Sequence, residues 1–155
     1  MVAVVIIAVA AAALLYATAA TPAGAATATC RGFAATITGT SGSDQLRGTT
    51  GRDVIVARGG NDQIESRGGN DLICAGDGTD QVLAGRGRDR VFGGRGPDQI
   101  AGGRGPDRLR GQGQDDALSG SRGDDRLNGG SGFDIGFGGI GSDICTAVDF
   151  VVSCA

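Results

Sequence analysis

Aspartates recur every nine residues through most of this chain, and their carboxylates are the side chains best placed to do chemistry. Two residues before each stands glycine, with Gln114 as the exception. Two residues after each of the first ten stands Leu, Ile or Val, and the last two copies have Gly136 and Cys145 there. The series comprises Asp44, Asp53, Asp62, Asp71, Asp80, Asp89, Asp98, Asp107, Asp116, Asp125, Asp134 and Asp143.

Carboxylates in this pattern favour metal binding over catalysis. The chain has no His and no Lys, so the usual general bases are missing, and we expect no enzymatic activity. Carboxylates stacked at strand spacing repel one another by about 1 kcal/mol per pair in water, so a column of them requires cations. Carboxylate oxygens and free turn carbonyls are the hard ligands that Ca²⁺ takes at six to eight coordination. The sequence therefore predicts several Ca²⁺ ions, held between turn i and turn i+2, with the twelve aspartates as metal ligands.

The elements that must position these aspartates follow from the same period. A fixed repeat of nine is typical of a solenoid, and six residues rich in Gly and Asp predict a turn before a three-residue strand. Gln45, Gln63, Gln81 and Gln99 recur every eighteen residues, as do Arg90, Arg108 and Arg126. One coil is then eighteen residues, with two strands on opposite faces. The predicted fold is all-β: a right-handed parallel β-roll or β-solenoid of tandem nine-residue repeats with N- and C-terminal caps.

The segment Gly93–Ala101 reads G-G-R-G-P-D-Q-I-A and resembles the nonapeptide G-G-x-G-x-D-x-U-x of the RTX, or haemolysin-type, calcium-binding repeat. The resemblance extends over Gly39–Thr146. It implies a parallel β-roll in which the motif aspartates and turn carbonyls coordinate Ca²⁺. Arginine departs from the family pattern at the third motif position, where it either neutralises the Asp columns or lies in solvent and pairs with Asp115, Asp124 or Glu65. We favour the second interpretation. These arginines are Arg86, Arg95, Arg104 and Arg122.

The first residues resemble a targeting segment. Val2–Tyr16 is apolar and uncharged, and small residues follow it, as in a signal peptide. No basic residue precedes the apolar run, and an uncleaved anchor is the alternative. We expect a signal peptide over 1–28, an N-terminal cap over 29–38, repeats over 39–146 and a C-terminal cap over 147–155. A secreted, extracellular protein without stable membrane insertion follows from this division.

Four cysteines in such a chain predict disulfides, and sequence alone leaves three connectivities open. We expect Cys30–Cys74, because the segment around Cys30 and Phe33 is the nearest cover for the apolar strip Val54, Val56 and Leu72. We also expect Cys145–Cys154, with the tail 149–152 closing the open core at the other end. Solenoids need such caps to stay soluble.

The predicted function is that of a secreted Ca²⁺-binding repeat protein that folds on binding Ca²⁺. The alternative is a structural or adhesive cell-surface protein that Ca²⁺ makes rigid, with a cell-wall or surface partner still to be identified. The net charge of −3 gives no reason to expect a nucleic-acid partner.

Overall fold

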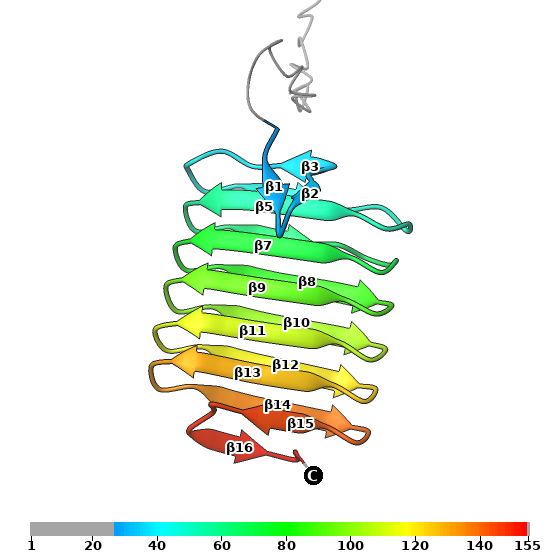
Figure 1. Ribbon diagram of the computed structural model, residues 1–155, viewed down its shortest axis with the longest axis vertical. Helices are drawn as coiled ribbons and strands as arrows, with labels where there is room; N and C mark the ends of the chain where they lie inside the picture. The colour runs from blue at the N-terminus through cyan, green and yellow to red at the C-terminus, as the bar shows by residue number, and fades with distance from the viewer. Residues whose placement is uncertain (1–26, 155) are drawn as a thin grey trace, which may run out of the picture.

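The computed structural model describes residues 27–154, in which every regular element is a β-strand. Most strands belong to two parallel sheets of seven strands each, which the chain visits alternately as it winds through about six coils (Figure 1). The first sheet contains β3 (Ile37–Thr38), β5 (Val54–Gly59), β7 (Leu72–Asp77), β9 (Arg90–Arg95), β11 (Arg108–Gly113), β13 (Arg126–Ser131) and β15 (Ile144–Thr146). The second sheet contains β4 (Gln45–Arg47), β6 (Gln63–Glu65), β8 (Gln81–Arg86), β10 (Gln99–Arg104), β12 (Ala117–Arg122), β14 (Ile135–Ile140) and β16 (Phe150–Val152).

The strand register confirms the coil of eighteen residues. Gln99 pairs with Gln81 in the second sheet, and Arg108 pairs with Arg90 in the first. Each strand therefore lies beside the strand two repeats earlier, on the same face of the solenoid. The glutamines that recur every eighteen residues therefore form a ladder on the second sheet, and the recurring arginines form a column on the first.

The strands are longer than the sequence predicted. From β7 to β14 each has six residues, because the ladder continues from the last three residues of one nonapeptide into the first three of the next. The second residue of that continuation has positive φ, as at Gly85 (φ 103°) and Gly94 (φ 126°), where glycine is the least strained residue. The turn proper thus contains only three residues, which end at the motif aspartate.

The core lies between the two sheets and is thin. Ten of the twelve nonapeptides contribute an aliphatic residue, as predicted, and Ala57, Ala75 and Ala84 add a second inward position that the sequence did not reveal. These alanines are fully buried because the first residue of the motif also faces inward. With side chains this small, the core alone provides little apolar burial per coil. The aliphatic core residues are Leu46, Ile55, Ile64, Ile73, Val82, Val91, Ile100, Leu109, Leu118 and Leu127.

A small hairpin covers the N-terminal part of the first sheet. Strands β1 (Thr29–Cys30) and β2 (Phe33–Ala34) pair antiparallel, and the predicted disulfide joins Cys30 to Cys74 with their Cα atoms 5.7 Å apart. Cys30 is buried in a cluster with the predicted apolar strip of Val54, Val56 and Leu72. The predicted segment therefore covers the strip, but Phe33 itself takes no part in the cluster: its side chain is 48% exposed, and the buried ring belongs to Phe92.

The C-terminal tail forms the last strand of the second sheet. Strand β16 pairs with β14, and the predicted disulfide joins Cys145 to Cys154 with their Cα atoms 5.9 Å apart. Cys145 packs against the core, as expected for its repeat position. The tail nevertheless does not bury its own apolar side chains, because Phe150 is 55% exposed and Val151 47%. It extends the sheet but leaves an apolar C-terminal end.

The expected signal peptide falls mainly on residues 1–26, which lie outside the described residues. Between residues 27 and 154, no helix has the length and hydropathy needed to cross a membrane.

Candidate metal centre

The twelve motif aspartates form two columns, one along each edge of the solenoid. The first-sheet column precedes the strands of the first sheet and runs from Asp53 to Asp143; the second-sheet column runs from Asp44 to Asp134. Every member except the half-buried Asp44 is buried. The structure therefore brings together all the predicted site residues, and it places them inside the turns.

One oxygen of each carboxylate connects successive coils. The backbone N–H of Asp80 donates to Oδ1 of Asp98 at 2.9 Å, and the N–H of Asp107 donates to Oδ1 of Asp125 at 2.7 Å. Ten such bonds, all between aspartates eighteen residues apart, join the members of the two columns. The motif aspartate is thus a structural residue of the turn as well as a candidate ligand.

The other oxygen has no partner in ten of the twelve aspartates. Their Oδ2 atoms are buried and accept no hydrogen bond from the described residues. Leaving a buried polar atom unsatisfied costs about 1–3 kcal/mol, and more when it carries charge. Ten unpartnered anionic oxygens in a small protein therefore call for cations. The ten are Asp62, Asp71, Asp80, Asp89, Asp98, Asp107, Asp116, Asp125, Asp134 and Asp143.

Asp44 and Asp53 differ because threonine satisfies their second oxygen. Thr40 donates its backbone N–H to Oδ2 of Asp44 at 2.6 Å and its hydroxyl to the same atom at 3.0 Å. Thr49 does the same for Asp53, at 2.7 and 3.0 Å. These two turns satisfy their carboxylates without a metal, so a cation here competes with existing hydrogen bonds. The predicted ligand role of Asp44 and Asp53 remains a prediction.

Backbone carbonyls approach the same turns closely. A Cβ added at Gly96 would collide with the carbonyl oxygen of Gly78 in the preceding coil, and φ at Gly96 is +116°. A Cβ added at Gly93 would collide with Oδ2 of Asp98 and lie 2.8 Å from the carbonyl oxygen of Gly111. Glycine is needed at these positions because carbonyl and carboxylate oxygens occupy the space where a side chain would begin.

Burial makes the metal-free columns electrostatically unfavourable. Desolvation raises the pKa of Asp98 and Asp107 to about 7, and that of Asp89 and Asp116 to about 6. The hydrogen bond from the neighbouring coil lowers each pKa, and the charge of the aspartate above or below raises it. The largest shifts lie in the middle coils. Metal-free carboxylates here resist ionisation at neutral pH, and a bound cation would remove that penalty.

The donor set fits Ca²⁺ better than a transition metal. No three His, Cys, Asp or Glu side chains converge on one point within residues 27–154, so a bound ion must take most of its ligands from backbone carbonyls. An all-oxygen set of this kind suits Ca²⁺, which accepts carbonyls and irregular geometry, more than Mg²⁺ or zinc. The residues present therefore fit Ca²⁺, with one free carboxylate oxygen per turn and carbonyls from two stacked turns.

Comparison with known families agrees with this geometry. The family described as RTX calcium-binding nonapeptide repeat (4 copies) matches residues 38–73, 75–109 and 110–145. The chain belongs to the RTX calcium-binding repeat family. RTX repeats bind several Ca²⁺ ions per repeat domain, so Ca²⁺ is a ligand of this protein. No curated protein and no solved structure matches the chain.

The structure adds one residue to the columns of this RTX chain that the sequence analysis missed. Oδ2 of Asp149 accepts the backbone N–H of Asp134 at 2.8 Å, as a thirteenth column member would. Its separation from Asp134 is fifteen residues instead of eighteen, because the last turn is three residues shorter. The sequence feature that could have revealed it is the segment Asp149–Val152, where an aspartate is again followed by strand-forming residues, although the nine-residue spacing is lost.

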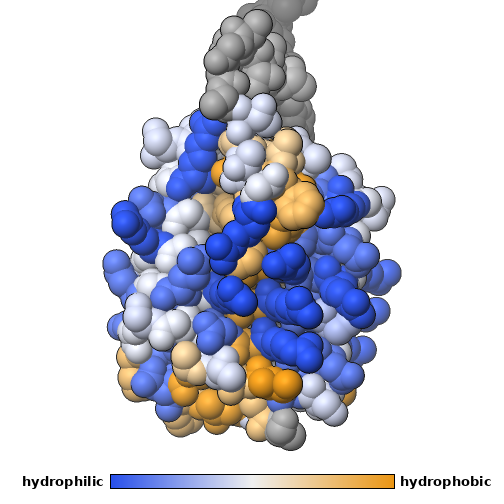
Figure 2. Space-filling model, in the orientation of Figure 1, coloured by the Kyte–Doolittle hydropathy of each residue, from blue (hydrophilic) through white to orange (hydrophobic). Residues whose placement is uncertain are grey.

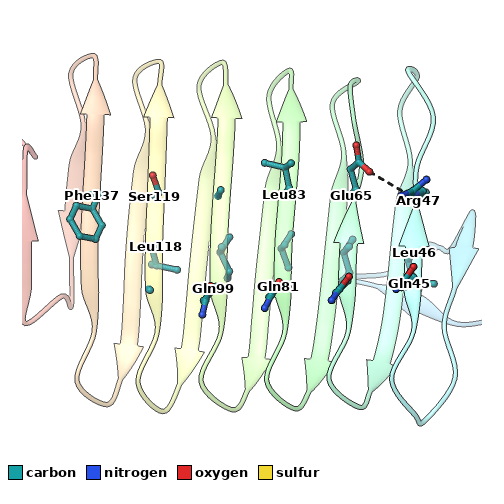
Figure 3. Close-up of a pocket in the computed structure, with 16 residues that line it drawn as sticks. Gln45, Leu46, Arg47, Glu65, Gln81, Leu83, Gln99, Leu118, Ser119 and Phe137 are labelled. Atoms are coloured by element: carbon teal, nitrogen blue, oxygen red, sulfur yellow. Dashed lines mark ion pairs between the residues drawn. The ribbon is translucent and has the colours of Figure 1, made fainter.

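The third-position arginines behave only partly as expected. Arg86, Arg95, Arg104 and Arg122 are exposed, as in the favoured interpretation, but none pairs with an acidic residue. The single ion pair among the described residues joins Arg47 and Glu65 at 3.6 Å (Figure 3). Asp115 and Asp124 instead accept backbone N–H groups, from Phe133 and Ser142, eighteen residues later.

Proposed function

We propose that this protein is a secreted Ca²⁺-binding module whose fold forms when Ca²⁺ binds. The observation that carries the proposal is the set of ten buried Oδ2 atoms without partners, in a chain whose core has about one aliphatic residue per repeat. Such a core does not offset the desolvation of two carboxylate columns. The free energy of metal binding then becomes free energy of folding.

The motif aspartates are the proposed ligands, with unequal roles. The ten with a free Oδ2 would each present one anionic oxygen, and turn carbonyls of the same and the neighbouring coil would complete the shell. Asp44 and Asp53 would bind more weakly, because a cation must displace the hydrogen bonds from Thr40 and Thr49. When bound, Ca²⁺ neutralises the columns and cross-links successive turns.

The proposed division of the chain follows the same logic. A signal peptide over 1–28 would direct the chain to an oxidising space, where the two disulfides persist. Residues 29–38 would cap the roll at its N-terminus, 39–146 would hold the RTX repeats, and 147–155 would cap the C-terminus. Mass spectrometry of secreted material tests the first boundary, because it reads the mature N-terminus directly.

Circular dichroism in Ca²⁺ and in chelator tests the function itself. We expect a mostly disordered spectrum in chelator, and β structure after Ca²⁺ is added in excess. Mg²⁺ at the same concentration is the control and should produce little change, because it gives up its waters reluctantly and demands octahedral geometry. Identical spectra in Ca²⁺ and chelator would overturn the proposal.

A further inference from the structure

The charges of this protein are segregated between interior and surface in a way that the net charge conceals. All 14 arginines are exposed, whereas eleven of the 17 acidic residues are buried in the columns. Each bound Ca²⁺ would add two further positive charges to the net charge of −3. The Ca²⁺-loaded molecule therefore presents a cationic surface to its surroundings.

The arginines are concentrated on one side of the solenoid. Ten lie where the chain passes from the second sheet to the first: at the ends of second-sheet strands, on the turns that follow, or on the first three residues of first-sheet strands. We call this surface the Arg face. Asp124 is the one exposed acidic residue in these connecting segments, and Asp77, also exposed, lies at the far end of β7. Figure 2 shows hydrophilic side chains gathered beside the first sheet, at the edge where β9, β11 and β13 begin in Figure 1. The Arg face contains Arg52, Arg67, Arg86, Arg88, Arg90, Arg104, Arg108, Arg110, Arg122 and Arg126.

Six of these side chains form two ordered columns. Arg90, Arg108 and Arg126 pair in register through the first sheet, and Arg86, Arg104 and Arg122 pair in register at the ends of β8, β10 and β12. Neighbours in each column are separated by the spacing of adjacent strands, about 4.8 Å. None of the six forms an ion pair with the described residues. Like charges at this spacing repel, so the columns lack the counter-charge that would stabilise them.

We propose that the Arg face binds an extended acidic polysaccharide, whose carboxylate or sulfate groups lie along the two arginine columns. The charge complementarity is direct, since a guanidinium binds planar or tetrahedral oxyanions through paired N–H groups. A linear polymer suits the face because the arginines repeat regularly along the long axis of the roll. The opposite face is unsuitable: it presents the neutral Gln ladder with Leu83, Ser119 and Phe137 (Figure 3).

The aromatic residues favour a polysaccharide over a nucleic acid. Single-stranded nucleic acid is bound through exposed aromatic rings on which bases stack. The one aromatic ring on the first sheet's strands is Phe92, which is only 6% exposed. Arg31 already lies over this ring, 4.3 Å from its centre, and Arg110 lies 5.7 Å from it. One exposed ring, Phe33, lies 5.5 Å from the guanidinium of Arg52, and a single ring at one end of the Arg face does not provide a platform for successive bases.

The test compares two triple variants with equal charge changes. The first carries Arg90→Gln, Arg108→Gln and Arg126→Gln; glutamine fits, because it occupies the same repeat position in β4, β6, β8 and β10. The control carries Arg47→Gln, Arg58→Gln and Arg95→Gln, which lie outside the Arg face. Binding to dextran sulfate and to polygalacturonate is measured in excess Ca²⁺ at low salt, with neutral dextran and single-stranded DNA as comparisons.

We expect the column variant to lose about a hundredfold in affinity for an acidic polysaccharide, since three contacts are lost at about 1 kcal/mol, or fivefold, each. The control variant should lose less than tenfold, and neutral dextran should not bind. The dextran sulfate and polygalacturonate arms distinguish sulfate from carboxylate as the preferred group. Equal losses in both variants, or tighter binding of DNA than of either polysaccharide, would overturn the proposal.

The proposed polysaccharide binding rests on the proposed function in one respect: it requires that Ca²⁺ folds the roll. Circular dichroism of both variants in Ca²⁺ reports folding separately from binding. A chain that shows no response to Ca²⁺ contradicts the proposed function, whereas a normally folded column variant with undiminished polysaccharide binding contradicts the Arg face alone. In chelator we expect weaker binding to both polysaccharides, because an unfolded chain does not hold its arginines in columns.

Discussion

Asp125 and Asp124 are neighbours in one turn, yet replacement by Asn should destabilise the protein at the first position and have little effect at the second. Oδ1 of Asp125 accepts the N–H of Asp107, and its Oδ2 is buried without a partner. Asp124 is exposed, and its Oδ1 accepts the N–H of Ser142 at 3.0 Å. Replacement of either by Asn preserves the amide oxygen as an acceptor and removes one negative charge. Only Asp125→Asn removes a candidate ligand oxygen.

The size of the effect follows from the loss of one site. At a free Ca²⁺ concentration a hundredfold above its dissociation constant, a site contributes about 2.7 kcal/mol to stability. The new amide N–H₂ of Asp125→Asn also points into a site built for a cation, so no compensating contact is expected. We therefore expect Asp125→Asn to lower the free energy of unfolding in Ca²⁺ by about 2–3 kcal/mol. Asp124→Asn should change it by less than about 0.5 kcal/mol, as for most surface substitutions.

Denaturant unfolding at a series of Ca²⁺ concentrations is the appropriate assay. The slope of the unfolding free energy against the logarithm of Ca²⁺ concentration counts the ions released on unfolding. Asp125→Asn should lower that count by about one relative to Asp124→Asn. Equal counts and equal stabilities in the two variants would refute the assignment of the unpartnered oxygens as ligands.

Three further predictions concern the glycines, the protons and the disulfides. Gly96→Ala should destabilise the protein by about 3 kcal/mol or more, because the added Cβ would meet a carbonyl oxygen and the residue has a positive φ. Gly42→Ala, at the same repeat position, should be tolerated, because the nearest atom to its added Cβ is 3.9 Å away. Thermal unfolding of both variants measures the difference. In chelator, where the chain should be mostly disordered at neutral pH, we expect more β structure at about pH 4.5 than at about pH 7.5. The pKa values of Asp98 and Asp107 are higher in the folded state, which therefore holds more protons than the unfolded chain over this range and loses stability as pH rises. More β structure by circular dichroism at the higher pH than at the lower would contradict this. Loss of the disulfide Cys30–Cys74, whose cysteines are 44 residues apart, should lower the free energy of unfolding by about 4 kcal/mol. Loss of Cys145–Cys154, whose cysteines are 9 residues apart, should lower it by about 2.5 kcal/mol. Denaturant unfolding of the Cys→Ser variants measures both losses, and the reverse order would contradict the prediction.

The sequence predicted the architecture well because its phase never slips between Asp44 and Asp143. A period of nine with a superperiod of eighteen is enough to predict two parallel sheets and their register. The length of the strands could not be predicted from the sequence in the same way. The ladder continues through Gly85 and Gly94 only because these residues adopt positive φ, and composition alone does not distinguish that conformation from a turn.

The sequence was enough to predict which aspartates form the site, but not how their hydrogen bonding differs from one turn to another. All twelve aspartates occupy the same position in the repeat. Asp44 and Asp53 differ from the other ten because a threonine four residues earlier donates hydrogen bonds to their Oδ2 atoms. Asp149 escaped prediction because the shortened last turn breaks the period. The column of Arg90, Arg108 and Arg126 was predicted, but the rest of the Arg face was missed, since a net charge near zero does not reveal that the acids are inside and the arginines outside.

Counting the bound ions tests the central claim most directly. The protein is passed through gel filtration in excess Ca²⁺, and the metal content of the folded peak is measured together with its protein concentration. The account predicts several Ca²⁺ ions per chain, up to the ten unpartnered carboxylate oxygens. A folded chain that carries one ion or none would contradict it.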